Sequence, residues 1–130
     1  MPAPTLWRVR FDEAQWQDDL RGATTTARAQ AAAWRKRIGV LRGLPNVQLR
    51  ACRAQDDAGL DLPHCVKTYI PNPDSPSLED SPWGAVLEVQ RDRDGYFLAF
   101  IAFGVRHPEA LASTKPSVYA IAHRRLFPAG

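Results

Sequence analysis

A chain of 130 residues in which 45% of the side chains are hydrophobic and 24% are charged has the composition of a globular domain, which argues against wholesale disorder. No stretch of about 18 consecutive apolar residues occurs, and the N-terminal stretch lacks the apolar core of a secretory signal. The two cysteines, Cys52 and Cys65, are too few for a disulfide framework. We therefore expect a single cytoplasmic domain over residues 1–130, without a membrane partner.

The net charge is +3, and after residue 20 the charged side chains fall into three blocks along the chain. Residues 21–53 contain eight basic and no acidic side chains, residues 54–95 contain nine acidic and three basic ones, and residues 96–130 contain four basic and one acidic. Charge separated in this way makes a dipolar surface, and a basic face of this kind attracts polyanions. A solvated helix face is the alternative explanation for the first block.

The first 45 residues predict a strand followed by two helices. Residues 6–11 alternate apolar and basic side chains, which is typical of a half-buried strand. Asp12 can cap a first helix that closes near Gly22, and Thr24 to Thr26 can cap a second one. In the second helix, apolar residues recur every three or four positions and form one buried stripe: Ala27, Ala31, Trp34, Ile38 and Leu41.

The rest of the chain predicts four strands and a last helix. The strands are 47–54, 65–70, 83–90 and 96–103, with a Pro-rich surface loop at 71–82 and a hairpin turn at Asp94-Gly95. A hairpin centred on Ala58-Gly59 would place Cys52 opposite Cys65. Ser113 or Thr114 can cap the last helix, which runs to about Leu126 with Pro116 in its first turn.

These elements predict an α+β fold. Its antiparallel sheet has four to five strands, with the two N-terminal helices on one face and a C-terminal helix.

Four side chains near the end of the chain predict acid–base chemistry: Arg106, His107, Tyr119 and His123. The first two follow the apolar strand, and the other two are four residues apart on one helical face. Cleavage of RNA through its 2′-hydroxyl needs a proton acceptor, a proton donor and cations for the charged transition state, which His and Arg can supply. Surface histidines and a capping arginine are the alternative. No metal-binding spacing or cofactor motif occurs, so we expect none.

A second group of residues predicts nucleic-acid binding. Lys67 and Tyr69 share one face of the strand 65–70, where a cation and an aromatic ring suit a polyanion and its bases. A solvent-facing strand with an amphipathic Lys and Tyr is the alternative, and the pattern favours it slightly. Basic side chains of the second and last helices would add contacts with the nucleic-acid backbone: Arg35, Lys36, Arg42, Arg124 and Arg125.

The order strand, helical pair, antiparallel strands and basic C-terminal end resembles the RelE/ParE superfamily of bacterial toxins. The segments that carry this resemblance are VKTYIP and WGAVLEVQRDRDGYFLAFIAF, and the matching residues are Lys67, Arg106, His107 and Tyr119. Many such toxins cleave messenger RNA on the ribosome, whereas the ParE branch poisons DNA gyrase. The chain differs in its strand 47–54, its Pro-rich loop and the helical position of the tyrosine.

The resemblance and the basic clusters together predict a metal-independent, RNA-cleaving toxin of a toxin–antitoxin pair. Its partners would be RNA or the ribosome, and an antitoxin protein. The alternative is a non-enzymatic binding module, such as an antitoxin, an immunity protein or a nucleic-acid-binding regulator, and the acidic stretch 54–95 favours it.

Overall fold

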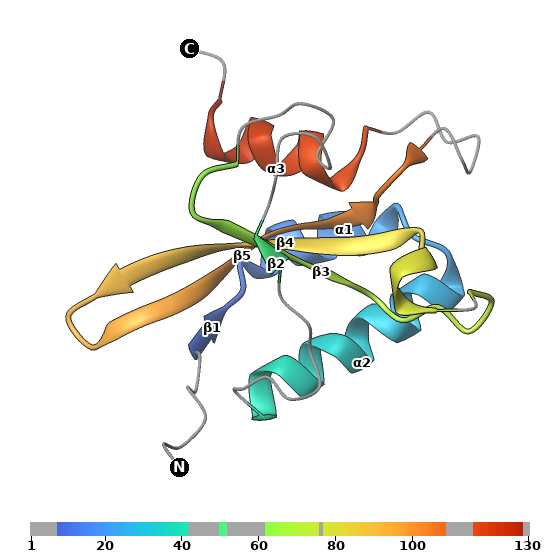
Figure 1. Ribbon diagram of the computed structural model, residues 1–130, viewed down its shortest axis with the longest axis horizontal. Coiled ribbons are helices and arrows are strands. Elements are labelled where there is room, and N and C mark those ends of the chain that lie inside the picture. Colours follow the sequence, from blue (N-terminus) through green and yellow to red (C-terminus); the bar gives the residue numbers. More distant parts are fainter. Residues whose placement is uncertain (1–7, 42–49, 52–61, 76, 109–115, 129–130) are drawn as a thin grey trace.

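The computed structural model describes residues 8–41, 50–51, 62–75, 77–108 and 116–128 (Figure 1). Its elements in chain order are β1 (Arg8–Arg10), α1 (Glu13–Arg21), α2 (Thr25–Leu41), β2 (Arg50–Ala51), β3 (Cys65–Tyr69), the 3-10 helix η1 (Leu78–Asp80), β4 (Trp83–Asp92), β5 (Gly95–Val105) and α3 (Val118–Leu126). This order confirms the predicted α+β class. No helix in the described ranges is long and apolar enough to cross a bilayer.

The first two helices begin where short polar side chains satisfy free backbone N–H groups. Asp12 Oδ1 accepts a hydrogen bond from Gln15 N at 3.1 Å, and Thr24 Oγ1 accepts one from Ala27 N at 3.1 Å. Both predicted caps are confirmed, and so is the buried stripe of α2 at Ala27, Ala31, Trp34 and Ile38.

The start of the last helix differs from the prediction, which placed the cap at Ser113 or Thr114, outside the described residues. Ser117 caps α3, since its hydroxyl accepts a hydrogen bond from Ala120 N at 3.1 Å. Pro116 therefore precedes the cap instead of lying in the first turn. The helix begins after Ser117 because the serine hydroxyl accepts a hydrogen bond from a free backbone N–H group of the first turn, and the proline side chain has no acceptor for it.

The sheet has five strands in the order β1-β5-β4-β3-β2. The pairs among β2, β3, β4 and β5 are antiparallel, but β1 runs parallel to β5, so the sheet is mixed and not wholly antiparallel as predicted. Hairpin turns force antiparallel neighbours, whereas β1 is followed by two helices and meets β5 only across the fold. Arg50 is in register with Lys67, as a hairpin centred on Ala58-Gly59 requires. Cys52 lies outside the described residues.

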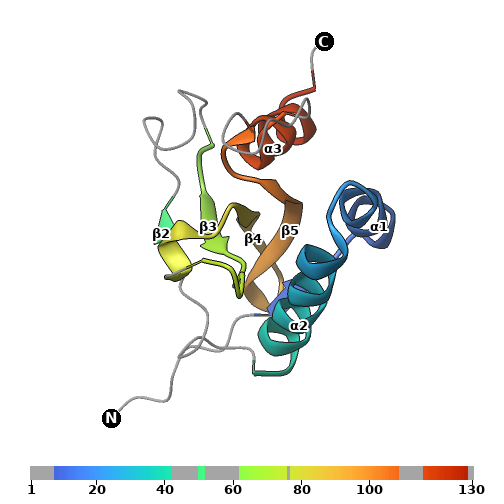
Figure 2. The same ribbon diagram turned by 90° about the vertical axis from the view of Figure 1, so that its right-hand side faces the viewer.

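Helices cover the two faces of the sheet separately (Figure 2). The face under α1 and α2 carries an aromatic core that includes Trp16, Trp34, Phe100 and Phe103. On the opposite face α3 packs over β4 and β5 through a smaller core of Val86, Ala102, Val118 and Ala122. Burial on both faces explains the apolar run that the sequence shows in β5.

An ion pair closes the edge of β5 that β1 leaves open, because β1 pairs only with residues 97–99 of that strand. Asp19 Oδ2 accepts a hydrogen bond from Phe103 N at 2.9 Å, and Arg125 Nη1 donates one to Ile101 O at 2.7 Å. Arg125 also binds the Asp19 carboxylate through both terminal nitrogens, at 2.8 and 2.9 Å. The pair thus replaces a missing strand and joins α1, β5 and α3.

The β4–β5 hairpin extends beyond the rest of the sheet as an arm (Figure 1), since β3 pairs with β4 only as far as Glu88. Arg8 and Arg10 of β1 both bind Asp92 near the tip of the arm.

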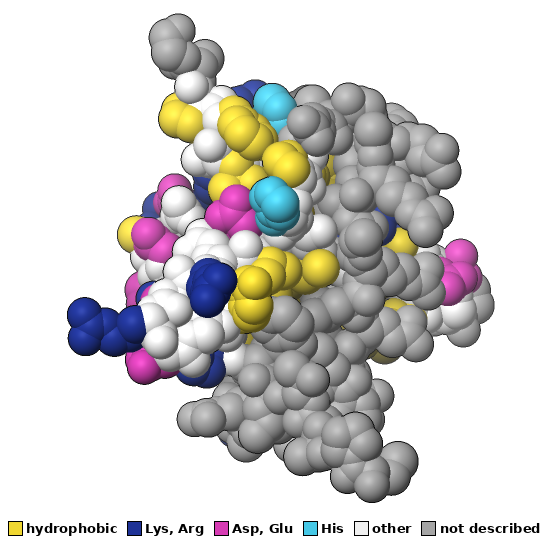
Figure 3. Space-filling view, turned by 60° about the vertical axis from the view of Figure 1, so that its left-hand side comes forward, with side chains coloured by type: hydrophobic (Ala, Val, Ile, Leu, Met, Phe, Trp, Pro, Cys, Tyr) yellow, Lys and Arg dark blue, Asp and Glu magenta, His cyan; other side chains and the backbone are white. Residues whose placement is uncertain are grey.

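Among the described residues on the face shown in Figure 3, Lys and Arg side chains lie among Asp and Glu side chains and do not form a single basic patch.

Acid should weaken the attachment of the arm to β1. The hydrogen bonds from Arg8 hold the pKa of the Asp92 carboxyl well below its ordinary value. A lowered folded-state pKa contributes stability that is present above the unfolded value of about 4 and is lost as the pH falls below it. We expect Asp92→Asn to lose less stability than the wild type between pH 6 and pH 3 in urea unfolding. Equal losses would contradict this role.

Candidate functional site

Arg106 is held at the end of β5 by backbone groups of the β3–β4 connection. Its N–H donates to Pro82 O at 2.7 Å. Its Nη1 donates to Glu79 O at 2.8 Å and to Ser81 O at 2.7 Å. Three hydrogen bonds therefore fix both the backbone and the guanidinium plane of Arg106 against η1 and the start of β4.

Two tyrosines contact the Arg106 guanidinium from different elements. Cζ of Arg106 lies 3.8 Å from the centroid of the Tyr69 ring on β3, which is a close cation–π contact. Nε of Arg106 donates to the hydroxyl of Tyr119 on α3 at 3.4 Å. Strand β3, strand β5 and helix α3 thus meet at one cationic group, which we call the Arg106 cluster: Lys67, Tyr69, Arg106 and Tyr119.

Two glycines make room for this cluster. Tyr69 is in register with Gly84 of β4, and Gly84 is in register with Gly104 of β5. A Cβ at Gly84 would lie 3.0 Å from Cγ of Arg106, so the arginine stem passes directly over that backbone. A Cβ at Gly104 would lie 3.7 Å from Cβ of Val118, where the first turn of α3 crosses the sheet. A glycine in a strand marks such a close approach.

Lys67 belongs to the cluster but lies in its interior. It is two residues before Tyr69 on the same face of β3, and Nζ is 5.6 Å from the centroid of the Tyr119 ring. Lys67 is 4% exposed and Tyr119 is 2% exposed. The sequence predicted that Lys67 binds nucleic acid and that Tyr119 belongs to the acid–base group. Burial instead places Lys67 beneath the surface against the Tyr119 ring and makes Tyr119 a support for Arg106.

The two candidate histidines lie in different surroundings. His107 directly follows Arg106 in the chain and is exposed. His123 lies one helical turn after Tyr119, is half-buried and packs its ring 5.1 Å from that of Phe127. No hydrogen bond or ring contact within the described ranges links His123 to Arg106. Among the described residues, the contacts of Arg106 thus join it to the two tyrosines and join neither histidine to the cluster.

The predicted basic residues outside the cluster serve the fold or face solvent. Arg35 binds Glu13 and lies over the Phe11 ring, with Cζ 4.2 Å from its centroid. Arg125 is engaged by Asp19, as described above. Lys36 and Arg124 are exposed, and Arg42 lies outside the described residues. We leave Arg35 and Arg125 out of the site because their guanidinium groups already bind carboxylates.

Sequence reasoning did not find the backbone carbonyls of Glu79 and Ser81 or the space over Gly84. The only local signal was the Trp-Gly pair at the start of a strand.

Among the described residues, no group of three His, Cys, Asp or Glu side chains is placed to hold a metal ion. No protein-family model, curated protein or solved structure matches the chain. The chemistry of the Arg106 cluster is therefore the starting point for a functional proposal.

A matched pair of glycine substitutions tests the geometry of the Arg106 cluster. Gly84→Ala should displace the arginine stem and destabilise the protein by about 1–3 kcal/mol, the usual effect of overpacking. Gly104→Ala meets only ordinary van der Waals distances and should cost less. Urea unfolding measures both effects, and the ring shift of Tyr69 in NMR spectra reports whether Arg106 has moved. A larger loss for Gly104→Ala would contradict the packing described here.

Proposed function

We propose that the protein is an endoribonuclease that acts at the Arg106 cluster without a metal ion. The observation that carries the proposal is the meeting of Arg106, Lys67 and two tyrosines at one end of the sheet, with the exposed His107 beside them. The Arg106 guanidinium raises the local positive potential, which attracts a phosphodiester and stabilises the negative charge that develops on its oxygens. The element order that resembles the RelE/ParE toxins supports the same reaction.

The reaction divides between two accessible side chains. His107 accepts the proton of the RNA 2′-hydroxyl, and the 2′ oxygen attacks the adjacent phosphorus. Arg106 binds the phosphoryl oxygens as negative charge builds on them. The bond from phosphorus to the 5′ oxygen breaks, and this leaving oxygen takes a proton from water. The products are a 2′,3′-cyclic phosphate and a 5′-hydroxyl.

Binding of RNA without cleavage is the second candidate. Nη1 of Arg106 already donates to two carbonyls, and no contact among the described residues joins a histidine to the cluster. Such a site holds a phosphate more readily than it completes a reaction that moves two protons. Retention of RNA that falls steeply with salt, and without products, would favour this candidate.

Incubation of purified protein with end-labelled RNA tests the proposal. Free RNA is assayed with EDTA to remove metal ions, and ribosome-bound messenger RNA is assayed in parallel with the magnesium that keeps ribosomes assembled. We expect cleavage of at least one of the two RNAs, and no cleavage of DNA of the same sequence, because DNA lacks the 2′-hydroxyl. Intact RNA in both assays would reject the nuclease proposal.

A further inference from the structure

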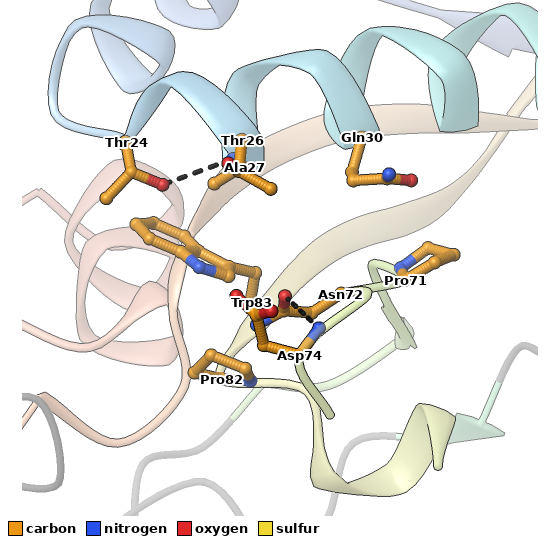
Figure 4. Close-up of a pocket in the computed structure, with 9 residues that line it drawn as sticks. All are labelled: Thr24, Thr26, Ala27, Gln30, Pro71, Asn72, Asp74, Pro82 and Trp83. Atoms are coloured by element: carbon orange, nitrogen blue, oxygen red, sulfur yellow. Dashed lines mark hydrogen bonds between the residues drawn. The ribbon is translucent and has the colours of Figure 1, made fainter. Parts of the chain in front are cut away.

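A cavity of about 320 Å³ lies between the start of α2 and the β3–β4 connection (Figure 4). This volume is near the lower end of the range for small-molecule sites. Figure 4 shows α2 residues on one side of the cavity and residues of the connection on the other, with the Trp83 side chain between them. The residues that matter below are Thr26, Gln30, Asn72, Asp74, Pro82 and Trp83.

The connection presents a hydrogen-bond acceptor beside a donor. The backbone N–H of Asp74 donates to Oδ1 of Asn72 at 3.1 Å. Because the amide oxygen of Asn72 is used in this way, its NH₂ group remains as a donor. The Asp74 carboxylate is an acceptor only. The Asx turn therefore orients the Asn72 amide, and the Asp74 carboxylate, two residues further on, lines the same cavity.

The polar groups that line the cavity have unused hydrogen-bonding capacity. Within the described ranges, no hydrogen bond or ion pair engages the Asp74 carboxylate or the Gln30 amide. The Trp83 indole N–H also has no hydrogen-bond partner there, although Trp83 is only 8% exposed. The flat rings of Pro82 and Trp83 add apolar walls. A planar ligand with several donors and acceptors on its edge fits this arrangement.

We propose that this cavity binds a guanine base of the RNA, an inference that rests on RNA being the partner of the protein. Guanine carries a carbonyl oxygen beside two parallel N–H donors on its Watson–Crick edge. The carboxylate of Asp74 accepts from both N–H groups, and the amide of Asn72 donates to the carbonyl. Adenine and cytosine present an unprotonated ring nitrogen toward the carboxylate, and uracil presents one N–H between two carbonyls.

The cavity adjoins the Arg106 cluster through a single residue. The Pro82 ring lines the cavity, and the Pro82 carbonyl accepts the backbone hydrogen bond of Arg106 at 2.7 Å. The cavity lies on the α2 side of the sheet and the Arg106 guanidinium contacts α3 on the other side, so an RNA strand bound at both would pass around the end of the sheet at Pro82. The cavity would make cleavage selective for RNA that contains guanine.

Isothermal titration calorimetry with the four ribonucleoside 5′-monophosphates tests this inference without any cleavage. We expect the guanine nucleotide to bind the wild type roughly tenfold or more tightly than the other three, as bidentate base recognition gives. Asp74→Asn should abolish this preference. The matched control, Asp94→Asn, removes an exposed carboxylate from the β4–β5 turn and should keep it.

Equal binding of the four nucleotides, no binding of the guanine nucleotide, or loss of preference in Asp94→Asn would overturn the inference. Competition by free arginine would also overturn the inference if arginine bound the cavity more tightly than the guanine nucleotide does. The natural occupant would then be an arginine side chain of a protein partner. If the protein prefers the guanine nucleotide but leaves RNA intact, the guanine site stands and the nuclease proposal is rejected. If the protein cleaves RNA but shows no nucleotide preference, the nuclease proposal stands and the guanine site is rejected.

Discussion

Arg125→Ala should destabilise the protein by about 3–5 kcal/mol, the usual cost of removing one partner of a buried ion pair. The Asp19 side chain is only 5% exposed, so the substitution leaves its negative charge without a counter-charge away from water. The Ile101 carbonyl at the edge of β5 also loses its donor. Urea unfolding at neutral pH measures the change in the free energy of unfolding. The two proteins are fitted with one common dependence of this free energy on urea concentration.

Arg21→Ala is the matched control for Arg125→Ala. Arg21 pairs with Asp18 on the same helix, but the two side chains are 74% and 64% exposed. Exposed pairs of this kind contribute roughly 0–1 kcal/mol. If the two arginine variants lost similar stability, the Asp19–Arg125 pair would not be closing the edge of β5.

His107→Gln should reduce RNA cleavage by about 10²- to 10⁴-fold, the usual contribution of one general base. His107 is exposed and directly follows Arg106, so glutamine in its place should leave the fold and the affinity for RNA unchanged. The rate is measured with excess protein, so that product release does not limit it, and thermal unfolding confirms that the variant is folded.

His64→Asn provides the control for His107→Gln. His64 is exposed, and its φ of 61° lies in the left-handed region, which asparagine tolerates better than most residues. Because nothing in the described geometry places His64 at the Arg106 cluster, its variant should cleave at the wild-type rate. A loss of activity in both variants, or in neither, would remove His107 from the reaction.

Local signals in the sequence were enough to predict most elements of the fold. Asp12 and Thr24 cap helices because their side chains reach N–H groups three residues ahead. The alternation in β3 and the apolar run in β5 follow from which faces are buried. The parallel pairing of β1 could not be predicted, because its partner is β5, which lies at the other end of the chain.

The residues of the Arg106 cluster could be predicted from the sequence, but how deeply they are buried could not. Lys67 and Tyr69 share a face because strand side chains alternate, and Arg106 follows directly from the end of β5. The depth of Lys67 and Tyr119 depends on how closely α3 approaches the sheet at Gly104, which is a tertiary property.

The structural roles of two basic residues have the same non-local origin. Arg35 and Arg125 find their carboxylates 22 and 106 residues away in the sequence. A charge pattern read along the chain assigns such arginines to the surface, because it contains no information about partners at this separation.

Identification of the 3′ ends of the RNA fragments by mass spectrometry tests the central claim most directly. Attack by the 2′ oxygen with His107 as the base leaves a 2′,3′-cyclic phosphate on the upstream fragment and a 5′-hydroxyl on the downstream one. We expect these ends from the wild type in the presence of EDTA. Fragments that end in a 3′-hydroxyl, with phosphate on the downstream fragment, would contradict the proposed reaction at the Arg106 cluster.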